Sequence, residues 1–352
     1  MSANAGNVGS ANSRVAGTAT RIAAVQKAFL GIIVVVLVMA VANLFPETSN
    51  NFFSEANFNN VLKSASIFLI LAMGETVVLL AGGVDLSIGG MMAFSGVVTI
   101  LLLNAGVPIP IAIVIALILG LAVGSINASI SVYQRAEPFI ITLGMGIVLT
   151  GAGLQLTNAR PVSSQVPAFA NLANLKILST VPVLGSVPVL RSLPILVFVM
   201  LAVVATIYFV LRNTSFGRNV YAIGGDPEVA KYSGINVLRT KAATYLICGL
   251  LAALGGVMLA SQLNSASSIA GDSTALYVVC AVVVGGTSVA GGVGGAIKSA
   301  IGLLLLGLLT NGFNLLKVDS HVSYVSTLFL GIVIVSILWL DSYGRKRRRE
   351  AV

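Results

Sequence analysis

Charge is the scarcest property of this sequence. Only 9% of its 352 residues are Asp, Glu, Lys or Arg, whereas 57% are hydrophobic and the mean hydropathy is +1.01. A water-soluble protein of this length could not cover its surface with so few polar side chains. The composition therefore excludes a soluble globular protein and predicts that a lipid bilayer surrounds most of the chain.

Residues that carry enzyme or metal chemistry are also scarce. The one histidine, His321, has no cysteine or acid at ligand spacing, so neither a zinc site nor a nucleophile–base pair is evident. The two cysteines, Cys248 and Cys280, both fall in apolar segments and form no metal-binding or disulfide pattern. Residues 292–299 come nearest to a phosphate-binding loop, but Ile297 stands where a glycine must precede the lysine. We expect no catalytic site, no metal and no bound cofactor in this chain.

Long apolar runs fill the sequence instead. A membrane-spanning helix needs about 20 mainly apolar residues, and period-2 alternation typical of barrel strands is missing from these runs. The sequence therefore predicts an all-α polytopic membrane protein with about ten transmembrane helices. The third and eighth segments are short and border glycine pairs, so either one is a candidate for a broken or re-entrant helix. The ten segments are 28–45, 61–81, 89–104, 109–132, 138–157, 192–211, 242–262, 275–290, 297–316 and 322–340.

Lys and Arg indicate the orientation of these segments. With ten spans both termini lie on one side, and fifteen of the 20 basic residues fall on that side, including the run 345–349. Cytoplasmic loops carry such an excess, so we expect both termini in the cytoplasm. The net charge of +9 is scattered over loops and one short tail, which argues against nucleic-acid binding. We divide the chain into a disordered N-terminal tail (1–27), a transmembrane domain (28–341) and a basic C-terminal tail (342–352).

A charged cytoplasmic segment joins the sixth and seventh apolar runs. Asp226, Pro227 and Glu228 form the start of a helix, because they supply a capping side chain, a proline for the first turn and an acid near the helix N-terminus. Gly234 fits the left-handed position that ends a helix. The pattern predicts a short helix near 226–234. An isolated helix of this length is unstable in water, so it needs neighbouring elements or a partner.

Two glycine-rich stretches interrupt the apolar runs. Residues 82–90 read Gly-Gly-Val-Asp-Leu-Ser-Ile-Gly-Gly, and residues 285–292 repeat this pattern with one residue removed. Paired interruptions in two halves of a chain are typical of transporters built from structural repeats. Chance similarity between glycine-rich segments is the competing explanation, and the sequence does not distinguish parallel from inverted repeats.

Three motifs in order, at 82–90, 224–237 and 281–292, resemble those of the ribose/galactose-type permease family of ATP-binding-cassette importers. The resemblance extends over about 59–341. The chain differs from the family pattern at Glu75, where a neutral residue is usual, and at Val293-Gly294, where Arg-Gly is frequent.

This resemblance implies a permease subunit in the inner membrane of a bacterial cell, where it pairs with a second permease copy in the lipid bilayer. The family receives sugar from an extracytoplasmic binding protein and is driven by a separate cytoplasmic ATPase that holds ATP and Mg²⁺. The short helix then corresponds to the coupling helix that seats in the ATPase. The residues assigned to ATPase coupling are Asp226, Pro227, Glu228, Ala230, Ser233, Gly234, Ile235 and Asn236.

Polar residues inside the apolar runs, or in the short break between the second and third runs, are candidates for the translocation pathway. An ionised carboxylate in mid-membrane costs about 2.5 kcal/mol or more, so Glu75 should be neutral, paired or facing a wet cavity. Intramembrane amides either bind solute hydroxyls or hold helices together. Asp85 either caps the next helix or contacts the solute. The candidates are Glu75, Asp85, Ser87, Asn127, Gln155, Asn311 and Asn314.

A secondary transporter driven by an ion gradient is the alternative function. In that case Glu75 and Asp85 would carry protons or sodium ions, and no ATPase would be needed. A purely structural membrane protein agrees poorly with the paired glycine interruptions and the buried polar residues.

Overall fold

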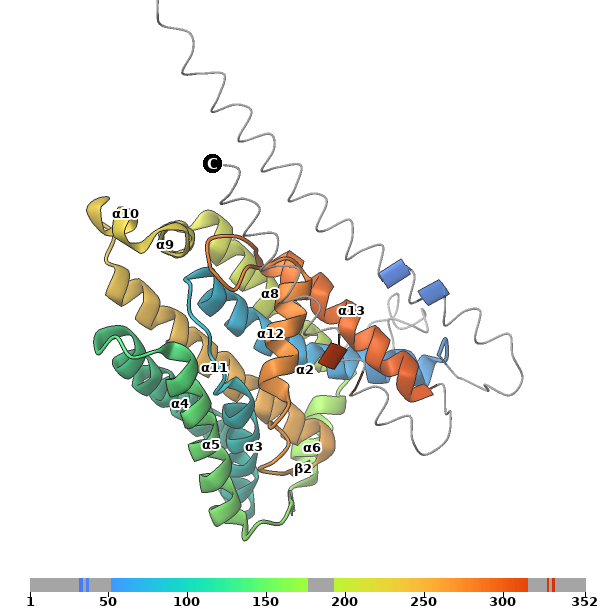
Figure 1. Ribbon diagram of the computed structural model, residues 1–352. Coiled ribbons are helices and arrows are strands. Elements are labelled where there is room, and N and C mark those ends of the chain that lie inside the picture. Colours follow the sequence, from blue (N-terminus) through green and yellow to red (C-terminus); the bar gives the residue numbers. More distant parts are fainter. Residues whose placement is uncertain are drawn as a thin grey trace, which may run out of the picture.

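A computed structural model of the chain describes residues 32–33, 36–37, 52–176, 193–315, 328 and 331–332. In these residues nearly all regular structure is helical (Figure 1). The elements are α2 (Glu55–Leu80), α3 (Ile88–Asn104), α4 (Ile109–Ala128), the π-helical turn η2 (Ser129–Tyr133), α5 (Pro138–Thr157), β1 (Val162–Ser163), α6 (Pro167–Asn174), α8 (Ile195–Asn213), α9 (Ser215–Gly225), α10 (Pro227–Tyr232), α11 (Val237–Leu263), β2 (Ser265–Ala266), α12 (Thr274–Val284) and α13 (Ala296–Leu315).

Five of the described helices are long and apolar enough to cross a membrane, counting α4 and η2 as one, and α3, α12 and the Ala296–Gly312 stretch of α13 are shorter apolar helices. This confirms the all-α polytopic class. The first and tenth predicted segments, 28–45 and 322–340, and both predicted tails lie almost wholly outside the described residues, so the predicted number of ten spans stays a prediction.

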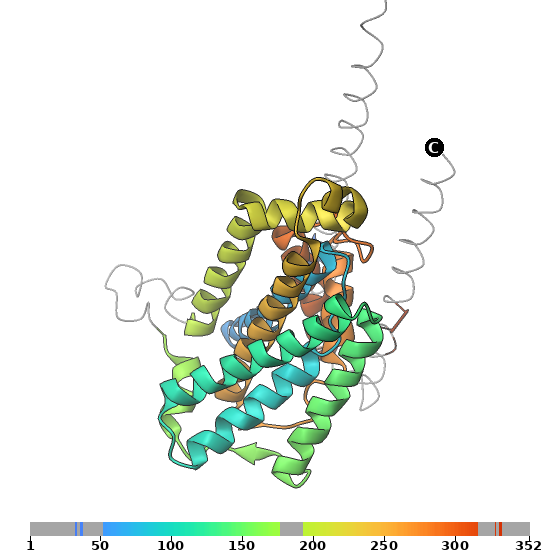
Figure 2. The same cartoon turned by 90° about the vertical axis from the view of Figure 1, so that its left-hand side faces the viewer.

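Two helices form the centre of the bundle. In the most apolar stretch of α2, 72% of the residues are buried, and the corresponding share is 67% for α11 but only 17% for α5. Helix α11 packs against α2, α3 and α4, whereas α5 packs mainly against α3 (Figures 1 and 2). The outward face of α5 exposes Ile140, Ile147 and Val148 by 62–67%, as expected for side chains that hydrocarbon surrounds.

Small residues set the contact between α4 and α11. A Cβ atom on Gly120 would lie 2.4 Å from the carbonyl oxygen of Gly249, and a Cβ on Gly249 would lie 2.2 Å from that of Gly120. The two backbones therefore touch, which is how helices associate in lipid, where no hydrophobic force drives them together.

The predicted boundaries agree with most helices, and two differences have clear causes. Helix α3 runs unbroken over 17 residues, because Gly89 and Gly90 lie in its first turn rather than interrupting it. Helix α12 does stop early, at Val284 before Gly285, as its glycine pair indicates.

The connection 158–191 contains β1 and α6 in its described part. Strand β1 pairs antiparallel with β2, and Phe169 of α6 is fully buried, so this connection is held against the bundle.

Helices α9 and α10 lie together at one end of the bundle (Figure 1). The corner between α8 and α9 is formed by Thr214. Its hydroxyl donates to the carbonyl oxygen of Val210 at 2.7 Å and accepts the N–H of Gly217 at 3.2 Å. One side chain therefore bonds to the last turn of α8 and caps α9.

Candidate functional site

Helix α10 has the capping expected from its sequence. The carboxylate of Asp226 accepts the N–H groups of Glu228 and Val229 at 2.9 and 3.1 Å, and Pro227 occupies the first helical position. Gly234 has φ +82°, and the N–H of Ile235 donates to the carbonyl oxygen of Ala230 at 3.1 Å. These bonds form a Schellman motif, which requires a left-handed residue and so favours glycine.

The outer face of α10 is unusually apolar for an exposed helix. Val229 is 60% exposed and Tyr232 86% exposed, whereas Ala230 is buried against the neighbouring elements at 3%. Of the other residues assigned to coupling, Asp226, Pro227, Glu228, Ser233, Gly234 and Asn236 are exposed and Ile235 is half-buried. Asn236 caps α11 by accepting the N–H of Arg239 at 3.0 Å. The sequence analysis did not assign Val229 and Tyr232 to ATPase coupling. Their presence as two bulky apolar residues in the most highly charged connection could have indicated such a role.

Helix α9, which the sequence did not predict, connects α10 to the bundle. A Cβ atom on Gly224, next to its end, would lie 1.9 Å from the carbonyl oxygen of Leu80 and 2.3 Å from the backbone nitrogen of Gly292. The N–H of Gly292 donates to that same Leu80 oxygen at 3.0 Å. We call Leu80, Gly224, Gly291 and Gly292 the glycine junction, because a Cβ on Gly291 would also lie 2.9 Å from Gly224. A Cβ on Gly291 would also lie 3.0 Å from the Cα atom of Gly82, so residues of all three sequence motifs meet at this junction.

The two glycine interruptions begin in the same way. At the end of α2, Gly82 has φ +73° and the N–H of Gly83 donates to Val78 at 3.1 Å; at the end of α12, Gly286 has φ +98° and the N–H of Thr287 donates to Val282 at 3.2 Å. Both are Schellman motifs. Helix α10 ends in this way too, so the shared motif alone does not establish a duplication, and the repeat stays a prediction.

Four predicted pathway residues gather in one buried cluster. Asp85 accepts the N–H of Ser87 at 2.9 Å and its hydroxyl at 2.5 Å. Asn127 of α4 donates its side-chain N–H₂ group to the Ser87 hydroxyl at 2.8 Å. Glu75 accepts the N–H of Asp85 at 3.3 Å, and the Cys248 sulfur lies 3.9 Å from its other oxygen. The cluster braces the irregular path between α2 and α3.

The buried cluster is closed to solvent. Glu75 and Asn127 are fully buried, and Asp85 and Ser87 are 1% and 2% exposed. Unpaired charge at such a position is costly, and the cluster satisfies its polar atoms mainly by internal hydrogen bonds. The side-chain oxygen of Asn127 is an exception, since it has no hydrogen-bond partner in the described part of the chain. Asp85 thus holds Ser87, the residue before α3, but no bond from Asp85 to an N–H of α3 itself is found among the described residues. A contact between Asp85 and solute stays a prediction.

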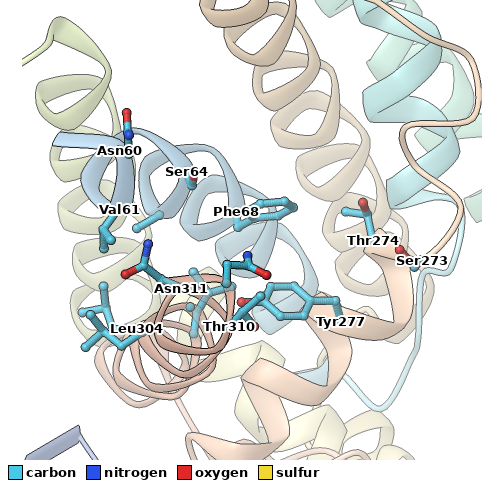
Figure 3. A pocket seen from close by; sticks show the side chains of 15 residues that line it. Asn60, Val61, Ser64, Phe68, Ser273, Thr274, Tyr277, Leu304, Thr310 and Asn311 are labelled. Carbon is cyan, nitrogen blue, oxygen red and sulfur yellow. The ribbon is translucent and has the colours of Figure 1, made fainter. Parts of the chain in front are cut away.

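A cavity of about 380 Å³ lies elsewhere, between α2, α12 and α13 (Figure 3). Phe68 and Tyr277 contact each other edge to face, with ring centroids 5.4 Å apart. Hydroxyl and amide groups surround the rings, contributed by Asn60, Ser64, Ser273, Thr274, Thr310, Asn311 and Asn314. We call this space the α2–α13 cavity. Its volume lies within the range of about 300–1,000 Å³ that is typical of small-molecule sites.

The three predicted amides outside the buried cluster have different surroundings. Asn311 and Asn57 exchange two hydrogen bonds of 2.9 and 3.0 Å, which join α13 to α2 at the edge of the cavity. Asn314 also lines the cavity and is exposed. Gln155 is exposed on α5 and belongs to neither group. The structure thus separates the seven candidates into a bracing cluster, a cavity pair and one outlying residue.

Comparison with known proteins gives a consistent result. The family described as "Branched-chain amino acid transport system / permease component" matches residues 57–338. The ribose import permease of Escherichia coli (strain K12) is 36% identical, over 90% of this chain and 93% of the relative. The D-allose transport system permease of the same strain is 31% identical over 88% and 89%, and an autoinducer 2 import permease of E. coli O9:H4 (strain HS) is 34% identical over 79% and 83%.

No solved structure matches the chain. The matched family covers the bundle, the glycine interruptions and α10 together, and each of the three relatives is matched over more than three quarters of its length. The chain is therefore a multi-pass membrane protein that belongs to the permease family of ATP-binding-cassette importers, as a transport subunit and not itself an enzyme.

Proposed function

We propose that this permease imports a sugar or sugar-like solute through a pathway that includes the α2–α13 cavity. The observation that carries the proposal is that α2, which lines this cavity, ends at the glycine junction, and that the loop joining the other two lining helices, α12 and α13, supplies Gly291 and Gly292 of the same junction. The proposed solute site and the proposed point of force transfer are therefore connected through α2 and through this loop.

The lining of the cavity suits a polyhydroxylated ring. Aromatic faces stack on the C–H side of a sugar, while amides and hydroxyls exchange hydrogen bonds with its hydroxyl groups. The described lining contains no Asp, Glu, Lys or Arg, so it offers no charged partner for the two ionised ends of an amino acid. The relatives named after ribose, allose and autoinducer 2 point to the same solute class.

Helix α10 serves as the coupling helix in this proposal. Its exposed Val229 and Tyr232 seat in a partner ATPase, and its movement reaches α9 because the two helices are adjacent in the chain and in contact. Gly224 of α9 then displaces Leu80 of α2 and Gly292 of the loop before α13, since no space separates these backbones. Two states of the bundle, open to opposite sides, would be favoured in turn by the ATPase.

The remaining partners follow from the family resemblance and the charge distribution. The excess of Lys and Arg supports a cytoplasmic position for α9 and α10, on the same side as both termini. A second permease copy completes the transmembrane part, an extracytoplasmic binding protein delivers the solute, and ATP with Mg²⁺ binds the ATPase. The outward face of α5 is available to lipid or to the second copy.

The test is uptake into proteoliposomes that contain the permease, its ATPase and its binding protein. We expect uptake of ribose, allose or autoinducer 2 that depends on ATP, and no uptake of leucine. Uptake of leucine alone would refute the sugar proposal. Uptake by the permease alone under an ion gradient, without ATP, would favour the secondary transporter instead.

A further inference from the structure

A second cavity, of about 520 Å³, lies between the end of α8, helix α9 and the start of α13. Its charged lining residues in the described chain are all basic: Arg212, Arg218 and Lys298. The two arginines, Arg212 and Arg218, are exposed and repel each other, so the arrangement favours an anionic occupant between them.

The backbone of this second cavity also suits an anion. Residues 296–298 form the first turn of α13, where N–H groups have no acceptor within the helix and the helix dipole is positive. Gly294 and Gly295 precede this turn with φ +141° and +147°, and a Cβ on Gly295 would lie 3.1 Å from the Tyr221 hydroxyl. The glycines therefore leave open the space that side chains would fill.

The position of the second cavity distinguishes a lipid from a soluble anion. Arg212 lies in the last turn of α8, after a long apolar run, and Lys298 lies in the first turn of the apolar α13. Both residues are therefore expected to lie at the boundary between the hydrocarbon core and the lipid headgroup region. Phe209 and Ile297 beside them are 57% and 48% exposed, so apolar surface adjoins the basic one. A molecule with a phosphate at one end and acyl chains at the other matches both parts.

We infer that this second cavity binds the phosphate headgroup of an anionic phospholipid in the leaflet next to α9. Arginine forms paired hydrogen bonds with phosphate oxygens, and Arg212 is held in place because its guanidinium lies 5.6 Å over the Tyr208 ring. Anionic lipids are concentrated in the cytoplasmic leaflet, which is the side proposed for α9. The lipid would attach α8, α9 and α13 to the membrane surface at the base of α10.

The experiment is a titration of the purified full-length permease in neutral detergent. Dioleoylphosphatidylglycerol is the probe, with dioleoylphosphatidylcholine and inorganic phosphate as separate arms, and the readouts are retained lipid in native mass spectrometry and the thermal unfolding midpoint. We expect saturable binding of the phosphatidylglycerol only. The variant carrying both Arg212→Gln and Arg218→Gln should bind it about tenfold more weakly or worse, whereas Arg218→Lys keeps the charge and most of the affinity.

Arg239→Gln is the matched control, because Arg239 is an exposed arginine near α9 and α10 that does not line the second cavity. It should bind the lipid like the unchanged chain. Equal binding of both lipids, unchanged binding by the double variant, or saturation by inorganic phosphate would each overturn the inference. The inference would also be overturned if the double variant no longer captured the ATPase but still bound the lipid. That result would show that this surface contacts the ATPase. Because the isolated chain is titrated, the result does not depend on the solute transported.

Discussion

The N–H of Gly292 donates a hydrogen bond of 3.0 Å to the carbonyl oxygen of Leu80, which joins the loop before α13 to the end of α2. Gly224 of α9 packs against both atoms of this bond, closer than any side chain would permit. A change of one methyl group at Gly224 therefore tests whether the contact transmits force.

Gly224→Ala should reduce ATP-dependent uptake strongly, because the new Cβ must push α9 away from Leu80 and Gly292. Overpacking of this kind also costs about 1–3 kcal/mol of stability. Gly225→Ala is the matched control, since nothing lies within 4 Å of a Cβ at that position. The measurements are uptake per ATP hydrolysed and the unfolding midpoint. Equal coupling in the two variants would show that the glycine junction transmits nothing.

The exposed apolar pair on α10 should contribute most of the ATPase contact. Truncating a central aromatic residue of an interface weakens binding by about tenfold or more, so Tyr232→Ala should lose ATPase in a pull-down, and Val229→Ser should lose some of it. Leu263→Ala removes a similarly exposed apolar side chain at the end of α11 and should have no effect. Full retention of the ATPase by both α10 variants would exclude this face as the docking surface.

Glu75 distinguishes a bracing role from ion transport. Glu75→Gln keeps an oxygen that accepts the Asp85 N–H, so ATP-dependent uptake and folding should be unchanged. Glu75→Leu removes the acceptor and leaves a buried N–H unpaired, at a cost of about 1–3 kcal/mol. Size-exclusion profiles in detergent and uptake measure the two effects. Loss of uptake by a well-folded Glu75→Gln variant would support the ion-driven alternative.

The three remaining amides should respond differently to substitution by alanine. Asn314→Ala should weaken solute uptake without loss of stability, because Asn314 is exposed at the α2–α13 cavity. Asn311→Ala should lower the unfolding midpoint, because it breaks both hydrogen bonds to Asn57. Gln155→Ala should change neither. A solute concentration series gives the half-saturating concentration for each variant, and a larger change in Gln155→Ala than in Asn314→Ala would move the pathway away from this cavity.

Local features were predictable from the sequence where local interactions decide them. The cap at Asp226, the left-handed Gly234 and the apolar lengths of α2, α5 and α11 follow from neighbouring residues alone. The meeting of Gly224 with Leu80 and Gly292 was not predictable, because glycine spacing does not reveal which backbones touch. The intramembrane polar residues were found by their rarity, but their division between the buried cluster and the cavity depends on helix packing.

Thr214 gives the corner between α8 and α9 a particular mechanical character. Its hydroxyl forms hydrogen bonds on both sides of the turn, so the angle between α8 and α9 should be rigid and the corner should not act as a hinge. A movement of α10 and α9 should then be transmitted to α8 through this corner instead of being lost at the bend. A substitution of Thr214 that removes both hydrogen bonds should therefore leave ATP hydrolysis by the ATPase intact while solute transport by the permease is lost.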